Sequence, residues 1–164
     1  MPLDNLSAAP TDFDFVMGDW VVAHRRLKER LVQCNEWIAF SGAMSTSKIL
    51  GGFGNVEDNV LHFPEGAFRA VALRSFDPST QRWSIWWLDG RFPGQIDVPV
   101  VGAFQDGVGT FYANDTVGNV PVTVRFIWRR ISQDELRWEQ AFSTDDRATW
   151  ETNWTMEFTR RPAP

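Results

Sequence analysis

Histidine is the side chain best suited to acid–base chemistry near neutral pH, and this sequence contains two, His24 and His62. His24 follows Trp20 and Val22 at alternate positions, so on a strand the three share one face, and an inward Trp20 places His24 inside the barrel or at its mouth. There it would act as a general base or as a haem or metal ligand. No His-x-His or His-x₃-His pair is present, and a metal would need distant carboxylates. A hydrogen-bonded, non-catalytic His24 is the favoured interpretation.

No other motif brings catalytic residues together. Cys34 is the only cysteine, so neither an internal disulfide nor a cysteine metal cluster can form. The glycine-rich run Leu50-Gly-Gly-Phe-Gly-Asn55 lacks the Lys-Ser/Thr and the following helix of a phosphate-binding loop, and a bend between strands is favoured instead. No catalytic residue, metal or cofactor is therefore predicted.

Length and composition are those of one globular domain. The chain has 164 residues, of which 43% are hydrophobic and 23% charged. We assign residues 11–161 to the domain, residues 1–10 to a flexible N-terminus and residues 162–164 to a tail. A net charge of −5 argues against nucleic acid or a membrane surface as partner, because both favour a basic face. The first residues lack the basic and apolar regions of a signal peptide, so a cytoplasmic location is predicted.

The C-terminal segment 148–160 alternates between two faces, which is the period of a strand with one side buried. One face carries Trp150, Thr152, Trp154, Met156 and Phe158, whereas the other carries Glu151, Asn153, Thr155 and Glu157. The whole chain has nine Trp and thirteen Phe but one Tyr. The pattern predicts an interior that is wide, aromatic and poorly supplied with charge.

Most other segments also predict strands, with turn residues at intervals of about 8 to 12 residues. A short helical turn is expected within residues 11–17, with Thr11 or Asp12 as its N-cap. The expected strands span residues 19–29, 35–43, 45–51, 55–63, 67–76, 81–89, 97–105, 109–116, 120–131, 135–144 and 148–160. Short links make neighbouring strands antiparallel, and bulky inward residues favour closure. We predict an all-β, up-and-down antiparallel barrel of about eight to ten strands.

Residues on the inward faces are candidates for a ligand cavity. Gln140 and Thr152 would orient a ligand among aromatic neighbours, or be satisfied by each other or by a buried water. Arg74 lies either at the barrel end or inside with a carboxylate or an anionic ligand. Of the adjacent Trp86 and Trp87, one faces the cavity and the other faces outward. The predicted ligand-binding residues are His24, Trp37, Arg74, Trp86, Tyr112, Trp128, Trp138, Gln140, Thr152 and Trp154.

Gly18-Asp19-Trp20, after a helical turn and at the start of the first strand, resembles the Gly-x-Trp signature of lipocalins and related calycin barrels. The resemblance implies that Trp20 closes one end of the barrel and that Arg160, or its neighbour Arg161, stacks across it.

Longer motifs resemble a bacterial family of lipocalin-like proteins to which no reaction is assigned. These motifs are Phe13-Asp-Phe-Val-Met-Gly-Asp-Trp20, Phe76-Asp-Pro-Ser-Thr-Gln-Arg-Trp83-Ser-Ile-Trp-Trp87 and Trp138-Glu-Gln-Ala-Phe-Ser-Thr-Asp-Asp-Arg-Ala-Thr-Trp150. The family commonly has paired glycines where this chain has Asp146-Arg147. The resemblance implies a calycin-type barrel with a small-molecule cavity.

The favoured function is binding of a small hydrophobic or aromatic molecule without chemistry. One alternative is a hydrolase, isomerase or decarboxylase that uses His24 or a buried carboxylate in the same cavity. A second is a filled barrel that acts as a homodimer or interaction module through Trp86 or Trp87 and the 91–101 loop. The volume of the cavity decides among the three.

Overall fold

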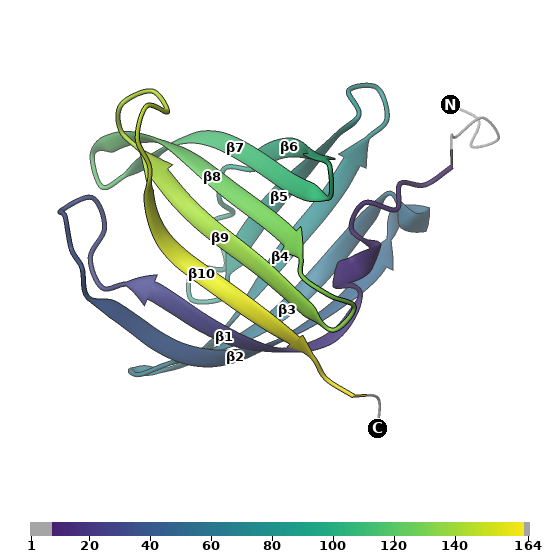
Figure 1. Ribbon diagram of the computed structural model, residues 1–164, viewed down its shortest axis with the longest axis horizontal. Coiled ribbons are helices and arrows are strands. Elements are labelled where there is room, and N and C mark those ends of the chain that lie inside the picture. The colour runs from purple at the N-terminus through teal and green to yellow at the C-terminus, as the bar shows by residue number, and fades with distance from the viewer. Residues whose placement is uncertain (1–7, 163–164) are drawn as a thin grey trace.

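Ten antiparallel strands close into one barrel, in which each strand pairs with its neighbours in sequence and β1 pairs with β10 (Figure 1). This computed structural model describes residues 8–162. The strands are β1 (Gly18–Leu27), β2 (Trp37–Ile49), β3 (Gly54–Phe63), β4 (Gly66–Asp77), β5 (Arg82–Asp89), β6 (Val100–Gln105), β7 (Val108–Val117), β8 (Val120–Arg130), β9 (Glu135–Ser143) and β10 (Glu151–Arg160). The predicted all-β, up-and-down barrel is confirmed.

One of the expected strands was surplus, because most of residues 35–43 and 45–51 belong to the single strand β2. Gly42 lies in the middle of β2, where a Cβ atom would come within 2.6 Å of the Val60 carbonyl oxygen and 2.7 Å of His24 Nε2. Gly42 therefore allows β3 and the His24 ring to pack closely against the middle of β2, and it does not mark a turn. The turn into β3 comes later, at the short 3-10 helix η3 (Leu50–Gly52).

Aromatic side chains fill one end of the barrel, which we call the closed end (Phe13, Trp20, Trp83, Phe111 and Phe158). The 3-10 helix η2 (Asp14–Val16) follows Phe13, whose ring meets the edge of Trp83 at 4.9 Å between centroids. The Trp20 indole N–H donates to the carbonyl oxygen of Val16 at 3.0 Å. The N-terminal segment thus plugs the barrel.

The expected helical turn is present, but neither Thr11 nor Asp12 caps it. Phe13 occupies the N-cap position without a side-chain hydrogen bond. The Asp12 carboxylate instead accepts a hydrogen bond from the Trp83 indole N–H at 2.9 Å. The Asp12 side chain, which the local sequence suggested as a helix cap, therefore makes a tertiary hydrogen bond instead.

The alternation of β10 breaks at a β-bulge. Trp154 faces inward, but the pairing of β10 with β9 shifts register between Thr152 and Trp154. Asn153 consequently takes a fully buried position, with no exposed surface. Thr152 pairs with Ala141 instead, and Trp150 packs outside the barrel against Tyr112. The prediction that Trp150 and Thr152 face the interior was wrong, because a bulge reverses the faces beyond it.

The opposite end of the barrel, which we call the mouth, is formed by the β1–β2, β3–β4, β5–β6, β7–β8 and β9–β10 connections (Figure 1). Among the described residues, no helix is long and apolar enough to cross a membrane. Most of the predicted flexible segment 1–10 and of the predicted tail 162–164 lies outside the described residues.

Candidate functional site

A cavity of about 480 Å³ occupies the barrel between the closed end and the mouth. Its volume falls within the roughly 300–1,000 Å³ typical of small-molecule sites. Its apolar lining includes Phe68, Ala72, Ile85, Trp87, Phe92, Val98, Val100, Ala113, Val117, Val124, Phe126, Trp128, Trp138, Phe142, Trp154 and Met156. Its polar lining includes Arg26, Arg30, Glu57, Arg74, Asp89, Arg91, Gln95, Asp97, Asp115 and Gln140.

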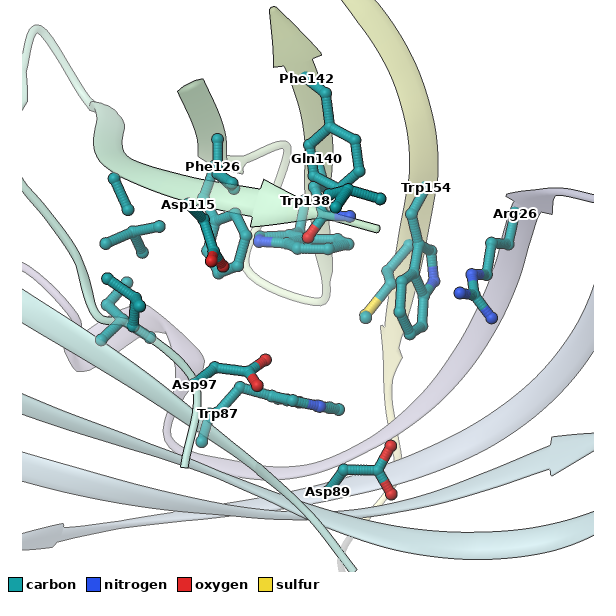
Figure 2. Close-up of a pocket in the computed structure, with 18 of the residues that line it drawn as sticks. Arg26, Trp87, Asp89, Asp97, Asp115, Phe126, Trp138, Gln140, Phe142 and Trp154 are labelled. Atoms are coloured by element: carbon teal, nitrogen blue, oxygen red, sulfur yellow. The ribbon is translucent and has the colours of Figure 1, made fainter. Parts of the chain in front are cut away.

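Aromatic rings from four strands form the middle of the cavity (Figure 2). Trp138 on β9 meets Trp154 on β10 edge to face, with 5.8 Å between ring centroids. Trp87 on β5 meets the same Trp154 ring at 6.5 Å, and Phe126 on β8 meets Trp138 at 5.0 Å. Edge-to-face packing fixes the rings while leaving ring faces open to a flat ligand.

The floor of the cavity holds a buried ion pair. The Arg74 guanidinium donates from Nη2 to Glu57 Oε2 and from Nη1 to Asn55 Oδ1, the latter at 2.7 Å. Asn59 Nδ2 donates to the other Glu57 oxygen at 3.0 Å. The Arg74 guanidinium also stacks on Trp128, 5.0 Å from the ring centroid. Of the two predicted environments for Arg74, the structure shows the buried one with a carboxylate partner.

Two carboxylates face the cavity from one side of the mouth. Asp115 lies on β7, whereas Asp97 lies on the 90–99 loop between β5 and β6 (Figure 2). The backbone N–H of Asp97 donates to the Trp87 carbonyl oxygen at 2.9 Å, which holds this loop against β5. Burial raises the pKa of Asp97, and the charges of Asp115 and Asp89 raise it further. Within residues 8–162, neither Asp97 nor Asp115 forms an ion pair.

Two arginines face the cavity from the other side. Arg26 lies at the end of β1 and stacks on Trp154, 5.2 Å from the ring centroid (Figure 2). Arg30 follows in the β1–β2 connection and also lines the cavity. Burial, reinforced by the charges of Arg30 and Arg91, lowers the pKa of Arg26 to about 10. Arg26 therefore remains positively charged at neutral pH. Neither Arg26 nor Arg30 forms an ion pair with any residue the structure describes.

A third arginine at the mouth is neutralised locally. Arg91 donates from Nη2 to Asp89 Oδ2 at 2.8 Å, and this hydrogen bonding lowers the pKa of Asp89. The Arg91 guanidinium also lies 3.7 Å from the Phe68 ring centroid. This pair closes one edge of the mouth without offering a free charge.

His24 is buried behind the aromatic wall. Its Nδ1 atom accepts a hydrogen bond from the Trp154 indole N–H at 3.1 Å, and its ring stacks on Phe40 at 4.6 Å between centroids. Burial lowers the pKa of His24 to about 4, so the ring is neutral at pH 7. Because Trp154 rather than His24 lines the cavity, the imidazole braces the wall instead of meeting a ligand.

The structure brings five of the ten predicted ligand-binding residues into the cavity lining and leaves five outside it. The five in the lining are Arg74, Trp128, Trp138, Gln140 and Trp154. Gln140 is oriented by a hydrogen bond from its Nε2 to Asn153 Oδ1 at 2.8 Å, in place of the expected partner Thr152.

The residues outside the lining are His24, Trp37, Trp86, Tyr112 and Thr152. Trp37 stacks with the outward Arg25, 5.2 Å from the ring centroid. Trp86 faces outward because its neighbour Trp87 faces inward. Tyr112 packs against Arg147 on the outer wall, 4.1 Å from ring centroid to guanidinium. Strand parity explains the outward positions of Trp37, Trp86 and Tyr112, whereas the bulge explains that of Thr152.

The stacking implied for the closed end is present. The Arg160 guanidinium lies 4.2 Å from the Trp20 ring centroid, and its Nη1 donates to the Met17 carbonyl oxygen at 2.9 Å.

Several charged lining residues were missed, although strand alternation could have found some of them. Arg26 follows Trp20, Val22 and His24 on the inward face of β1, and Asp115 follows Phe111 and Ala113 on β7. Asp97 and Arg30 lie in connections, where no period applies. The expectation of an interior poor in charge was wrong for the mouth. No metal site explains these charges, since no group of three His, Cys, Asp or Glu side chains among the described residues is arranged to hold an ion.

A closed antiparallel barrel with a cavity open at one end defines a lipocalin-like, calycin-type fold. The structure of an S-type phycobiliprotein lyase from Guillardia theta is similar, with a TM-score of 0.60 over 93% of this chain and 92% of that chain. The two sequences are 10% identical, so the likeness extends to the fold. The sequence matches no protein-family model and no curated protein.

Proposed function

We propose that this protein binds a small aromatic molecule in the barrel cavity. The observation that carries the proposal is the cavity of about 480 Å³ whose middle is walled by Trp87, Trp138, Trp154 and Phe126. Aromatic faces in a partly enclosed site favour flat apolar groups, because stacking and burial both contribute to binding. The lipocalin-like fold supports the proposal.

The charged residues at the mouth change the kind of ligand that we expect. A purely hydrophobic molecule would leave Asp97, Asp115, Arg26 and Arg30 partly buried without partners, which is unfavourable. The ligand we propose is therefore aromatic in the middle and polar toward the mouth.

The motifs shared with the bacterial lipocalin-like family support a common origin with that family, which we propose as well. The cytoplasmic location, the absence of nucleic-acid and membrane partners, and homodimer formation stay predictions.

A matched pair of variants tests whether the cavity binds ligands. Ala113 lines the cavity, whereas Ala103 is exposed on the neighbouring strand β6. We expect the neutral aromatic dye N-phenylnaphthylamine to bind the unmodified protein and the Ala103→Trp variant equally, as followed by dye fluorescence. Ala113→Trp should weaken binding at least about tenfold by filling the cavity.

No dye binding, or equal binding by both variants, would contradict the proposal. Native mass spectrometry of protein purified from its own host provides a second measurement, because a retained ligand appears as added mass.

A further inference from the structure

Charges without partners lie on two sides of the same cavity, and the two sides carry opposite signs. Figure 2 shows Asp97 and Asp115 turned toward the space on one side, with Arg26 beside Trp154 on the other. The aromatic rings of Trp87, Trp138 and Trp154 lie between them. The acidic and basic groups do not neutralise each other within ion-pair distance in the described part of the chain.

The acidic side is fixed by the backbone. Asp115 lies on β7 at an inward position, and one of its carboxylate oxygens accepts the Thr116 backbone N–H at 2.7 Å. Asp97 is held by its backbone hydrogen bond to Trp87 and by the bridge between Leu88 and Ile96. The two carboxylates are thus presented to the cavity before any ligand arrives.

The basic side is fixed by ring stacking. The Arg26 guanidinium lies over Trp154 and over Phe63, at 5.2 Å and 5.7 Å from the centroids, while Arg30 lies over Phe142 at 5.6 Å. The Arg26 Nε atom is buried and makes no hydrogen bond to any described residue. The stacking aims the guanidinium groups but does not neutralise their charge.

We propose that the cavity selects an aromatic molecule with a basic nitrogen group at one end and a carboxylate at the other. The nitrogen group pairs with Asp97 and Asp115, the carboxylate pairs with Arg26 and Arg30, and the aromatic middle lies among the tryptophans. Only a ligand with both groups supplies a partner to both sides, since a group of one sign satisfies one side alone. This inference rests on the proposed binding function and specifies its ligand class.

Four biphenyl probes test the inference by titration calorimetry. They are biphenylmethanol, biphenylmethylamine, biphenylcarboxylic acid and the aminomethyl biphenylcarboxylic acid that carries both groups at opposite ends. All four present the same aromatic middle, so differences in Kd report the end groups. The probe with both groups should bind at least about tenfold more tightly than the neutral alcohol, and each probe with one charge should fall between them.

Paired variants assign each end of the probe. Asp97→Asn with Asp115→Asn should remove the advantage of the amine and keep that of the acid, whereas Arg26→Gln with Arg30→Gln should do the reverse. Arg25→Gln and Asp58→Asn are the matched controls, because Arg25 and Asp58 are exposed and do not line the cavity. Thermal unfolding of every variant verifies that the barrel is folded.

The outcomes separate this inference from the proposed function. Equal Kd values for all four probes, or an advantage that survives both paired variants, would overturn the charge selection while leaving aromatic binding intact. Failure of every probe to bind, together with failure of N-phenylnaphthylamine, would overturn both.

Discussion

The two ends of the barrel differ in whether their charged side chains have ion-pair partners. At the closed end, Trp20 and Trp83 each donate to an oxygen, and the nearby Arg74 is held by Glu57 and Asn55. At the mouth, Arg26, Arg30, Asp97 and Asp115 face the cavity without ion-pair partners, within the residues the structure describes. Satisfied polar groups stabilise a fold, whereas unsatisfied ones are free to recognise another molecule.

The same contrast extends to aromatic side chains. Phe13, Trp83 and Phe111 are almost completely buried and fill the closed end. Trp87 and Trp154 are half-buried and line the space toward the mouth. One barrel is therefore both filled and hollow, so a count of tryptophans does not reveal whether such an interior has room for a ligand.

Breaking the ion pair at the closed end should have the largest effect on stability. Glu57→Gln leaves the Arg74 charge buried without a carboxylate and should cost about 3–5 kcal/mol of unfolding free energy. Asp58→Asn, at the next position of β3, breaks only an exposed pair with Arg69 and should cost less than about 1 kcal/mol. Urea unfolding measures both.

A further variant separates charge from packing. Glu57→Leu combined with Arg74→Met removes both charges and should recover part of the stability lost in Glu57→Gln, because no buried charge remains uncompensated, although Asn55 and Asn59 lose their hydrogen-bond partners. Equal losses in Glu57→Gln and Asp58→Asn would refute the contrast between the buried and exposed pairs.

The neutral His24 behind Trp154 should make the barrel sensitive to acid. Its pKa is about 4 in the folded protein, whereas the ordinary pKa of an imidazole, as in the unfolded chain, is 6.5. The unfolded state therefore binds more protons, and stability is lost as pH falls from about 6.5 toward 4. The loss attributable to His24 should reach about 3 kcal/mol at pH 4, since each unit of pKa difference corresponds to about 1.4 kcal/mol.

Comparing variants isolates this contribution from the carboxylates that titrate in the same range. His24→Gln should show a shallower decline of unfolding free energy between pH 7.5 and 4 than the unmodified protein. His62→Gln, at an exposed position, should retain the original decline. Parallel curves for the unmodified protein and His24→Gln would show that burial of this imidazole does not contribute to acid sensitivity.

Replacing an arginine should reduce stability more at the closed end than at the mouth. Arg160→Met loses the stacking on Trp20 and hydrogen bonds to the carbonyl oxygens of Met17 and Gln133, so it should cost about 2 kcal/mol. Arg26→Met also loses stacking, but it removes an uncompensated charge and should change stability by less than about 0.5 kcal/mol. Thermal and urea unfolding compare them; a larger loss in Arg26→Met would contradict the contrast.

Alternation in the sequence predicts most of the cavity wall, because a strand buried on one side leaves a clear period. Phe126, Trp128, Trp138 and Gln140 all line the cavity from β8 and β9, as their spacing requires. The same rule fails on the N-terminal side of Trp154, at Thr152 and Trp150, because one extra residue in the bulge exchanges the two faces. A bulge depends on pairing between strands, which the order of residues within one strand does not encode.

The mouth is harder to predict, because part of it is made by connections. Arg26 and Asp115 share the inward parity of their strands, so a reading that followed alternation through charged positions would have included them. Asp97 enters the cavity only because the 90–99 loop folds back along β5. That path is set by contacts of the loop with β5, and no periodic pattern in the sequence reveals them.

Substitutions in the β9–β10 connection at the mouth should have the smallest effect on stability. They test the position at which this chain departs from the family motif. Asp146 and Arg147 stand where the family commonly has glycines, and both adopt left-handed backbone angles, with φ of 57° and 69°. Asp146→Gly should therefore relieve strain and stabilise the protein by about 0.5 kcal/mol. Thr144→Gly, in the same connection but without a positive φ, should destabilise it by a similar amount. The urea midpoints of the two variants should therefore move in opposite directions. A loss of stability in both variants would mean that the backbone at Asp146 is not strained. The hydrogen bond from the Thr149 backbone N–H to the Asp145 carboxylate, at 2.8 Å, would then be sufficient to hold the turn.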